Sequence, residues 1–419
     1  MLAVGLWATS AVPEHLTALG FFLLAMLFNI APPAIVFSGF ESAALWLVFG
    51  GLIVGVAVRH AGLGDRLSLH IANKLHGSYV GIVAGMIGLG TTLAFLMPSS
   101  MGRILIIAPI AEAVAARFGF RKGSSGRTGV VLAAIFGTSL PAFAILPANL
   151  ANAVLMGSAE TLYGIRLEYG EYLLLHFPVL GILRGLGLLA LIVLMFPAKP
   201  DERQADIALE RRMLPKERLV MGVVFVSVVL WMTDSLHQIS PAWIALGAGL
   251  ICLVPQLKLV PPNAFNQEIN YASIFLCAGI VSLGNLVASS GLGEFLSLEI
   301  LQLLPLSPDR PAQNFVALSL TAVVTGVVST TAGTPAILTP LAGEFARASG
   351  LALKTVIMTQ VIGISTVLLP YQAASIVVGM TVAGESLGPA VRLCFALALF
   401  GILVLIPIDY FWFRALGWL

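Results

Sequence analysis

The chain has 419 residues, of which 58% are apolar and only 10% are charged, and its formal net charge is +2. With a mean hydropathy of +0.99, this composition excludes a water-soluble globule, because too few polar side chains are available to cover its surface. The basic residues lie in loops rather than in one patch, which argues against a nucleic-acid interface. We therefore expect an all-α polytopic membrane protein, located in a bacterial-type inner membrane.

Apolar segments long enough to cross a bilayer recur along the chain. A hydrocarbon core of roughly 30 Å requires about 20 apolar residues per helix. Such segments occupy residues 16–36, 41–61, 79–118, 128–158, 170–196, 218–235, 241–257, 271–289, 313–348, 355–384 and 390–416. They predict about ten to twelve crossings. The apolar stretch before Pro13 is too short for a span and lacks the basic start of a signal peptide, so we expect a missing or misplaced start.

The chain repeats itself. Residues 44–69 return as residues 273–298, and both copies contain a Gly-Leu-Gly followed by an acidic residue, Asp65 or Glu294. Residues 98–111 return as 329–342, and residues 145–154 as 368–377. We therefore predict a first repeat over 1–196, a linker over 197–218 and a second repeat over 219–419. The second copy has an apolar lead-in from Leu219 that the first lacks, so we expect the first copy to be clipped.

The distribution of Lys and Arg predicts how the copies are inserted. With the linker placed in the cytoplasm, 14 basic residues fall inside and five fall outside. The inside set is Arg59, Arg66, Lys74, Arg117, Arg121, Lys122, Arg127, Lys199, Arg203, Arg211, Arg212, Lys216, Arg218 and Lys258, and the outside set is Arg166, Arg310, Arg347, Lys354 and Arg414. This asymmetry requires an odd number of crossings in each copy, which makes the repeat inverted. Inverted repeats are typical of secondary transporters, with the site at the midplane.

Each copy contains a segment that predicts a re-entrant hairpin. In residues 79–118, a glycine-spaced limb ends at Pro98, and serines precede a second apolar limb. In residues 313–348, Ser329, Thr330 and Thr331 precede Thr334, predicted to be the N-cap, and Pro335 at the first helical position. Two opposed helix N-termini form a site for an anion. The candidate substrate-binding residues are Ser99, Ser100, Gly102 and Arg103 in the first copy and Thr330, Thr331, Gly333 and Thr334 in the second.

Arg103 is the charge in this pattern that most needs an explanation, because no other formal charge lies between residues 75 and 111. A charge at that depth costs several kcal/mol unless it has a partner or a wet cavity. Its guanidinium would offer a bidentate fork to a carboxylate or sulfate. In the alternative, both limbs span the membrane and Arg103 is an interfacial anchor in a surface loop.

Prolines after each hairpin predict two broken helices, over 128–158 and 355–384. The breaks contain Pro141, Pro147 and Pro370. At the same midplane, hydroxyls, amides and freed carbonyls would line an ion or substrate pathway. Its candidate residues are Thr138, Ser139, Asn149, Ser365, Thr366, Tyr371 and Gln372. In the alternative, the prolines are packing features alone.

The other ionisable residues of the apolar segments predict less. Arg392 begins a span and is expected at the interface. Arg184 lies deeper and could face the bundle interior, but no break or polar neighbour in the sequence marks a site around it. Asp234, Asp409, His176 and Glu112 are expected to be interfacial or capping residues, which disfavours a proton relay. The three cysteines, Cys252, Cys277 and Cys394, lie singly in apolar runs and are expected to be core residues.

The order of these elements resembles the divalent-anion:sodium symporter family, which carries dicarboxylates, citrate or sulfate, within the wider ion-transporter superfamily. The resemblance covers essentially the whole chain. It is carried by residues 6–24, by residues 41–69 ending AGLGDRLSL, by the first hairpin, by residues 160–179 and by the second-half copies. It implies two hairpins, two broken helices, a domain that moves like an elevator against a scaffold, a homodimer, and sodium as coupling ion near Ser99, Thr138, Thr330 and Ser365.

The departures from the family fall at the site itself. The family's Ser-Asn-Thr hairpin tips read Ser99-Ser100-Met101 and Thr330-Thr331-Ala332 in this chain, and its Gly-Thr-Pro-Pro-Asn loop reads Ile145-Leu146-Pro147-Ala148-Asn149. The resemblance therefore supports the family's transport architecture in this chain better than it supports the family's sodium coupling. Our hypothesis is that Arg103 takes the place and supplies the charge of one bound cation.

These patterns favour a secondary-active transporter of a small anion, a di- or tricarboxylate or sulfate, with sodium as the possible coupling ion and no organic cofactor. The alternatives are a sodium-independent exchanger or exporter, an anion channel, and a membrane scaffold with an inactive site. A channel is less expected, because it requires a row of weak sites. An intramembrane enzyme is disfavoured, because there is no His-Glu-x-x-His, no pair of apposed aspartates and no Ser-His pair at one depth.

Overall fold

The structure is a computed structural model that describes residues 6, 12–64, 66, 78–201, 213–292 and 300–419. Within these ranges it is built from helices, with no strand. Several residues named in the sequence analysis lie outside the described residues: Asp65, Lys74, Glu294, and Arg203, Arg211 and Arg212 of the linker. The ends of both Gly-Leu-Gly repeat segments also lie outside them.

Over its described residues, the first half of the chain forms ten α-helices and three other helical elements. The α-helices are α2 (Glu14–Leu27), α3 (Pro33–Val36), α4 (Ser38–Glu41), α5 (Ala43–Ala61), α7 (Tyr79–Leu96), α8 (Ser100–Arg117), α9 (Ser125–Ser139), α10 (Leu150–Tyr163), α11 (Tyr169–His176) and α12 (Arg184–Met195). The other elements are two 3-10 turns, η1 (Pro141–Ala144) and η2 (Leu146–Ala148), and a π-helix, η3 (Phe177–Leu183).

The second half has the same kinds of element. Its α-helices are α13 (Pro215–Met232), α14 (Asp234–His237), α15 (Pro241–Leu253), α16 (Ala264–Gln267), α17 (Tyr271–Ser289), α19 (Pro311–Val328), α20 (Gly333–Leu338), α21 (Ala342–Ser349), α22 (Leu353–Ile364), α23 (Ala374–Val382), α24 (Leu387–Phe400) and α25 (Ile406–Ala415). The 3-10 turns are η4 (Pro255–Leu257), η5 (Thr339–Leu341) and η6 (Pro370–Gln372), and the π-helix is η7 (Gly401–Leu405).

Seven of the described helices are long and apolar enough to cross a membrane. They are Ala43–Ala61, Tyr79–Leu96, Ser125–Ala144, Tyr169–Met195, Tyr271–Ser289, Pro311–Val328 and Leu387–Ala415, and three shorter apolar helices are Glu14–Leu27, Pro241–Leu253 and Leu353–Ile364. The prediction of an all-α polytopic membrane fold is confirmed. The re-entrant path of the hairpins, the inverted insertion and the domain boundaries stay predictions.

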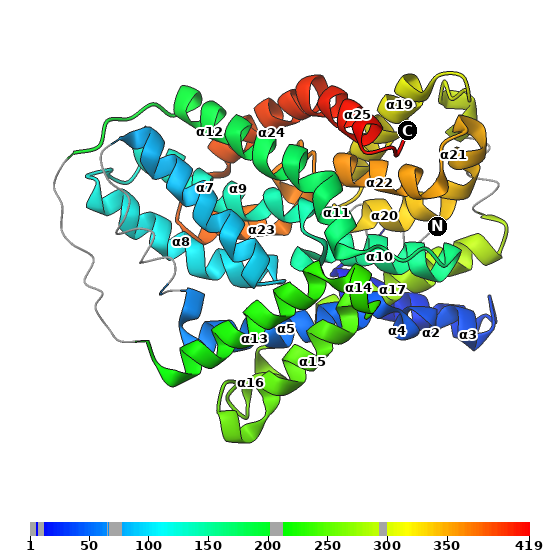
Figure 1. Cartoon of the computed structure of the whole chain (residues 1–419), viewed down its shortest axis with the longest axis horizontal. Helices are drawn as coiled ribbons and strands as arrows, with labels where there is room; N and C mark the ends of the chain where they lie inside the picture. The colour runs from blue at the N-terminus through cyan, green and yellow to red at the C-terminus, as the bar shows by residue number, and fades with distance from the viewer. Residues whose placement is uncertain (1–5, 7–11, 65, 67–77, 202–212, 293–299) are drawn as a thin grey trace.

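The helices form two packed groups, and each group contains one half of a broken helix from the other half of the chain. In one group α7, α8, α9 and α12 pack together, and α23 from the second half packs on α8 and α9. In the other, α10 from the first half packs on α17, α20 and α22. Figure 1 shows α5, α13 and α15 along the lower edge of the view, below the first group, and α5 packs directly on both other helices. The breaks of both broken helices therefore lie where the two groups meet.

Both long spans that follow the broken helices contain a π-helix. The π-helix η3 separates α11 from α12, η7 separates α24 from α25, and the two π-helices contact each other. Pro178 and Pro407 lack the backbone N–H that an α-helix would use at these places, which accounts for the local change in hydrogen bonding. Such π-segments are frequent at functional sites.

Candidate functional site

A cavity of about 470 Å³ lies between the two hairpin tips, the two helix breaks and the helices α5 and α17. Eight of the fifteen residues predicted from the sequence line it: Ser99, Ser100, Ser139, Asn149, Thr330, Thr331, Tyr371 and Gln372. The other seven are not among the lining residues: Gly102, Arg103, Thr138, Gly333, Thr334, Ser365 and Thr366. The structure therefore brings the tips and breaks of both repeats to one space.

The first hairpin turns where the sequence predicts. The helix α7 ends at Leu96, and Ser99 caps α8 by accepting a hydrogen bond from the Gly102 N–H at 3.1 Å. Capping by serine satisfies one of the free N–H groups at the helix start. Gly51 of α5 faces this tip so closely that a Cβ atom there would lie 2.8 Å from the Pro98 Cβ.

The side chain of Arg103 is fully buried and points away from the cavity, into the first helix break. Its Nε donates to the Thr138 hydroxyl (3.1 Å). Its Nη1 donates to the carbonyls of Met97 and Ala148 (2.8 Å for Ala148), and its Nη2 to the Ser100 hydroxyl (3.1 Å) and the Thr138 carbonyl (3.2 Å). A guanidinium has five N–H groups, so all of them are used.

The expectation that Arg103 offers a bidentate fork to the substrate is therefore wrong for this conformation. The fork is closed by three carbonyls and two hydroxyls, which are the oxygen ligands that also suit a small hard cation. The alternative of an exposed interfacial anchor is also wrong, because Arg103 has no exposed surface.

Hydroxyl groups at both hairpin tips are free to donate into the cavity. The oxygens of Ser99, Ser100 and Thr330 each accept a bond, from Gly102 N, Arg103 Nη2 and Gly333 N respectively. Among the described residues, none of these three hydroxyls donates to a protein acceptor. Each proton is therefore available to an anion, and the donor strength of the Ser100 hydroxyl is increased by the guanidinium behind it.

The second hairpin tip differs in detail from its prediction. The helix α20 begins at Gly333, one residue before the predicted Thr334 cap, and its N-cap is Ala332, which has no capping side chain; the Thr330 Oγ1 accepts from Gly333 N at 3.2 Å. Thr334 instead donates to the Thr330 carbonyl at 3.1 Å, because its position inside the first turn places its hydroxyl over that group. The Thr331 N–H donates to the Gln372 carbonyl at 3.0 Å, which joins this tip to the second break.

Side-chain amides hold both breaks open. Asn149 caps α10 by accepting from Asn152 N at 2.9 Å, and its Nδ2 donates to the Ala142 carbonyl at 3.0 Å. The Gln372 side-chain oxygen accepts from the N–H groups of Leu368 and Leu369, both at 2.8 Å. These bonds replace the ladder that an intact helix would have, as buried irregular backbone requires. The two breaks meet where the hydroxyls of Ser139 and Ser375 lie 3.3 Å apart.

Sequence reasoning missed Asn152, which is fully buried. Its Nδ2 donates to three carbonyls of the first break, those of Ala142 (3.3 Å), Phe143 (3.2 Å) and Ile145 (2.9 Å). The signal was available: an asparagine three residues after a helix-capping asparagine, inside an apolar segment. Ser375, Asn270 and Ser273, which also line the cavity, were missed too.

Three deeper ionisable residues are buried, which fits the inward-facing alternative for Arg184 and corrects the expectations for Asp409 and His176. Arg184 is 3% exposed and has polar neighbours, because Nη1 donates to the Ser365 carbonyl and Nη2 to the Thr366 hydroxyl at 3.5 Å. Asp409 and His176 have no exposed surface, so neither faces solvent or lipid. Asp234 is buried and accepts from the Tyr169 N–H at 2.6 Å, which fits a capping role. The three cysteines are buried and unpaired, as expected.

The charges next to the cavity are unevenly placed. Among its described lining residues, Glu14 and His15 are the only titratable side chains apart from the phenol of Tyr371, and no lysine or arginine reaches the wall. The nearest positive charge that the hydrogen bonds identify is Arg103, one residue layer behind Ser100. The wall itself is mostly apolar, with Leu47, Leu52 and Phe143 among its members.

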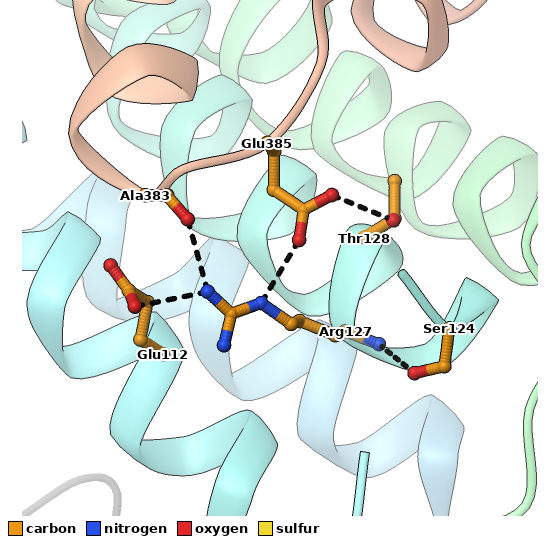
Figure 2. Close-up of polar contacts among 6 residues, drawn as sticks. All are labelled: Glu112, Ser124, Arg127, Thr128, Ala383 and Glu385. Carbon is orange, nitrogen blue, oxygen red and sulfur yellow. Dashed lines mark hydrogen bonds and ion pairs between the residues drawn. The ribbon is translucent and has the colours of Figure 1, made fainter. Parts of the chain in front are cut away.

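A separate group of ionic contacts joins the two halves away from the cavity. Figure 2 shows Arg127 of α9 between Glu112 of α8 and Glu385 of the loop after α23. Its Nη2 also donates to the Ala383 carbonyl at 3.0 Å, and Thr128 donates to the second oxygen of Glu385 at 3.0 Å. This cluster fixes the end of α23 against the first hairpin and the first broken helix.

The comparisons agree with this architecture. The family model described as "Sodium:sulfate symporter transmembrane region" matches residues 1–419. A "Membrane protein" of Cupriavidus necator is 25% identical over 80% of this chain and 70% of its own length. The "Sodium-dependent dicarboxylate transporter SdcS" of Staphylococcus aureus strain USA300 is 21% identical over 72% of this chain and 64% of its own length, so the matched region spans less than two thirds of that relative.

Among solved structures, the Alcanivorax borkumensis YdaH transporter is similar with a TM-score of 0.61 and 16% identity, over 94% of this chain and 89% of that one. At this identity the likeness concerns the fold. The seven apolar helices and the whole-chain family match establish an integral, multi-pass membrane transporter rather than an enzyme, and bacterial relatives fit a bacterial inner membrane. The chain belongs to the sodium:sulfate symporter family.

Proposed function

We propose that the protein is a secondary-active carrier of a small divalent anion, a dicarboxylate or sulfate, which binds in the cavity between the hairpin tips. The observation that carries this proposal is the set of hydroxyl donors from both tips, Ser99, Ser100 and Thr330, with Arg103 behind one of them. The dicarboxylate is favoured because it has one anionic group for each tip and because the SdcS relative is named for that substrate.

Arg103 acts on the anion through Ser100. The guanidinium fixes the oxygen of Ser100 and leaves its proton to point toward the anion, so the charge strengthens a hydrogen bond that it does not itself make. The low dielectric around a fully buried guanidinium lets its charge reach the cavity with little screening.

The same contacts favour transport that does not use a sodium ion at the position expected in the first repeat. The predicted sodium position near Ser99 and Thr138 requires free oxygens, and both oxygens of Thr138 accept from Arg103. A fixed cation cannot leave when the anion leaves. The empty carrier would then hold an uncompensated buried charge, which disfavours its return and favours exchange of one anion for another.

An elevator-like motion is supported by the contact between the first hairpin and α5. Gly51 and Gly55 of α5 lie against Pro98 and Ser99, so at these two positions the tip meets the backbone of α5 and not a side chain. The absence of side chains at these positions favours sliding of the first tip along α5. A homodimer in which the α5 side is the fixed part completes the proposal, as the family resemblance implies.

The test is uptake of labelled succinate, citrate and sulfate into proteoliposomes, with sodium, potassium or a preloaded anion. We expect uptake that needs a preloaded anion and not sodium, and that is lost in Arg103→Ala. Arg392→Ala is the matched control, because that arginine is exposed on α24. Sodium-driven uptake that survives Arg103→Ala would refute the role of Arg103. Concentrative exchange would exclude a channel, and a complete lack of transport with all three anions would refute the proposed substrate class.

A further inference from the structure

We infer that Arg184 is a second fixed cation, which occupies the break of the second broken helix as Arg103 occupies the break of the first. The inference rests on the proposed function and extends it to the second repeat. It assigns to Arg184 the position that the resemblance gives to a sodium ion near Ser365.

The contacts of Arg184 place its charge at the end of a half-helix. The helix α22 ends at Ile364, and Ser365 follows it directly. The Ser365 carbonyl accepts from Arg184 Nη1, and the Thr366 hydroxyl lies 3.5 Å from Nη2. The last carbonyls of a helix have no partner within it and carry partial negative charge, so a cation there is stabilising.

The first break has the same arrangement. Thr138 lies in the last turn of α9, and its carbonyl accepts from Arg103 Nη2 at 3.2 Å. At each break, therefore, a buried guanidinium binds the end of the first half of the broken helix, in the last turn of α9 or at the residue that follows α22. The arginines come from different elements, one from the second limb of a hairpin and one from the start of α12 after η3.

The surroundings of the two arginines differ in one respect. Asp409 on α25 interacts electrostatically with Arg184. Both carboxylate oxygens of Asp409 are buried and lack a hydrogen-bond partner in the described part of the chain. An acidic side chain therefore lies near Arg184, whereas the hydrogen-bond partners of Arg103 are carbonyls and hydroxyls only. Arg184 does not line the cavity, so it is a positioning residue for the second break and not a substrate ligand.

Three non-α-helical segments converge on Arg184, which explains how a long side chain fits there. Arg184 directly follows the π-helix η3. Gly401 is the first residue of η7, and a Cβ atom there would lie 3.4 Å from Thr366 Oγ1 and 3.9 Å from Arg184 Nη2. The widened turns of η3 and η7 make room for the guanidinium between the two long spans and the second break.

The test measures thermal unfolding of the purified full chain in detergent, in sodium or potassium chloride at constant ionic strength. The variant is Arg184→Ala/Asp409→Asn, which opens the Ser365 carbonyl without leaving a buried carboxylate unpaired, and the control is Arg392→Ala. We expect the native protein and the control to show no sodium-selective change. The double variant should show a saturable sodium-selective rise in Tm of at least about 2 °C, or the same rise with millimolar guanidinium.

Two results would overturn the inference. One is a folded double variant that responds to neither sodium nor guanidinium. The other is a saturable, sodium-selective rise in the Tm of the native protein. If the double variant does not fold, the Tm of the native protein in sodium and potassium chloride is the measurement that tests the inference. The assay contains none of the three candidate anions, so its outcome is independent of the uptake experiment, and failure of the proposed function is distinguishable from failure of this inference.

Discussion

Arg127 Nε and Glu385 Oε1 lie 2.9 Å apart, although 258 residues separate them in the chain. Their side chains are 12% and 7% exposed, so the pair is largely shielded from water. Glu112 completes the cluster on the other edge of the guanidinium. The first hairpin, the first broken helix and the end of the second broken helix therefore share one ionic contact.

Glu385→Gln should destabilise the protein by about 3 kcal/mol, because it leaves a largely buried guanidinium with a weaker partner. The measurement is thermal unfolding of the detergent-solubilised protein. Glu344→Gln is the control, since its ion pair with Arg347 is on the surface, where the arginine side chain is 75% exposed, and should contribute less than about 1 kcal/mol. Equal stability of the two variants would contradict the structural role of the cluster.

Asn152→Ala should destabilise the first break by about 2 kcal/mol, because a buried amide that donates to the break is lost, although the carbonyls of Phe143 and Ile145 keep a second donor each, the Tyr172 hydroxyl and the Ala148 N–H. Asn149→Ala should cost about 1 kcal/mol, the usual value for a helix cap. Unfolding curves of the two variants give this order directly. If Asn149→Ala proved the more damaging, the break would depend on its cap rather than on the buried amide.

Ser100→Ala should raise the KM for the transported anion by about tenfold, because it removes the hydroxyl that connects Arg103 to the cavity. Ser139→Ala is a suitable comparison, since its hydroxyl faces Ser375 and not a cation, and we expect about a twofold change there. Initial uptake rates over a range of anion concentrations separate KM from the maximal rate. An unchanged KM in Ser100→Ala would place the anion elsewhere in the cavity.

Gly51→Ala should slow transport by about tenfold or more, because its Cβ would lie 2.8 Å from the Pro98 Cβ and the hairpin tip would have to shift. Gly20→Ala is the matched control on α2, where a Cβ would have no neighbour within 4 Å. Uptake rates and the monodispersity of both variants are measured together. A Gly51→Ala protein that transports at the native rate would argue against close sliding of the tip along α5.

The parts of the fold that the sequence predicted are those with local chemical signals. Pro98 and Ser99 mark the first hairpin turn, and Pro141 and Pro147 mark the break between α9 and α10, because proline and capping side chains act within a few residues. Hydropathy was enough to predict an all-helical membrane protein, since it depends on composition and segment length alone.

The parts that could not be predicted depend on contacts between distant segments. The burial of Asp409 and the contact of Arg184 with Ser365, 181 residues away, follow from how two long spans pack on the second break. No local pattern encodes this packing. The prediction of where Arg103 points was wrong for a similar reason. Its acceptors Thr138 and Ala148 belong to the first broken helix, whose position the sequence alone does not give.

The closed shell of oxygens around Arg103 has a consequence for the conditions in which the carrier works. A guanidinium stays charged over the whole physiological pH range, and it is attached to the chain, so its occupancy of the first break does not depend on the surrounding medium. A cell in fresh water or another sodium-poor habitat would keep this charge in place as well as a cell in the sea.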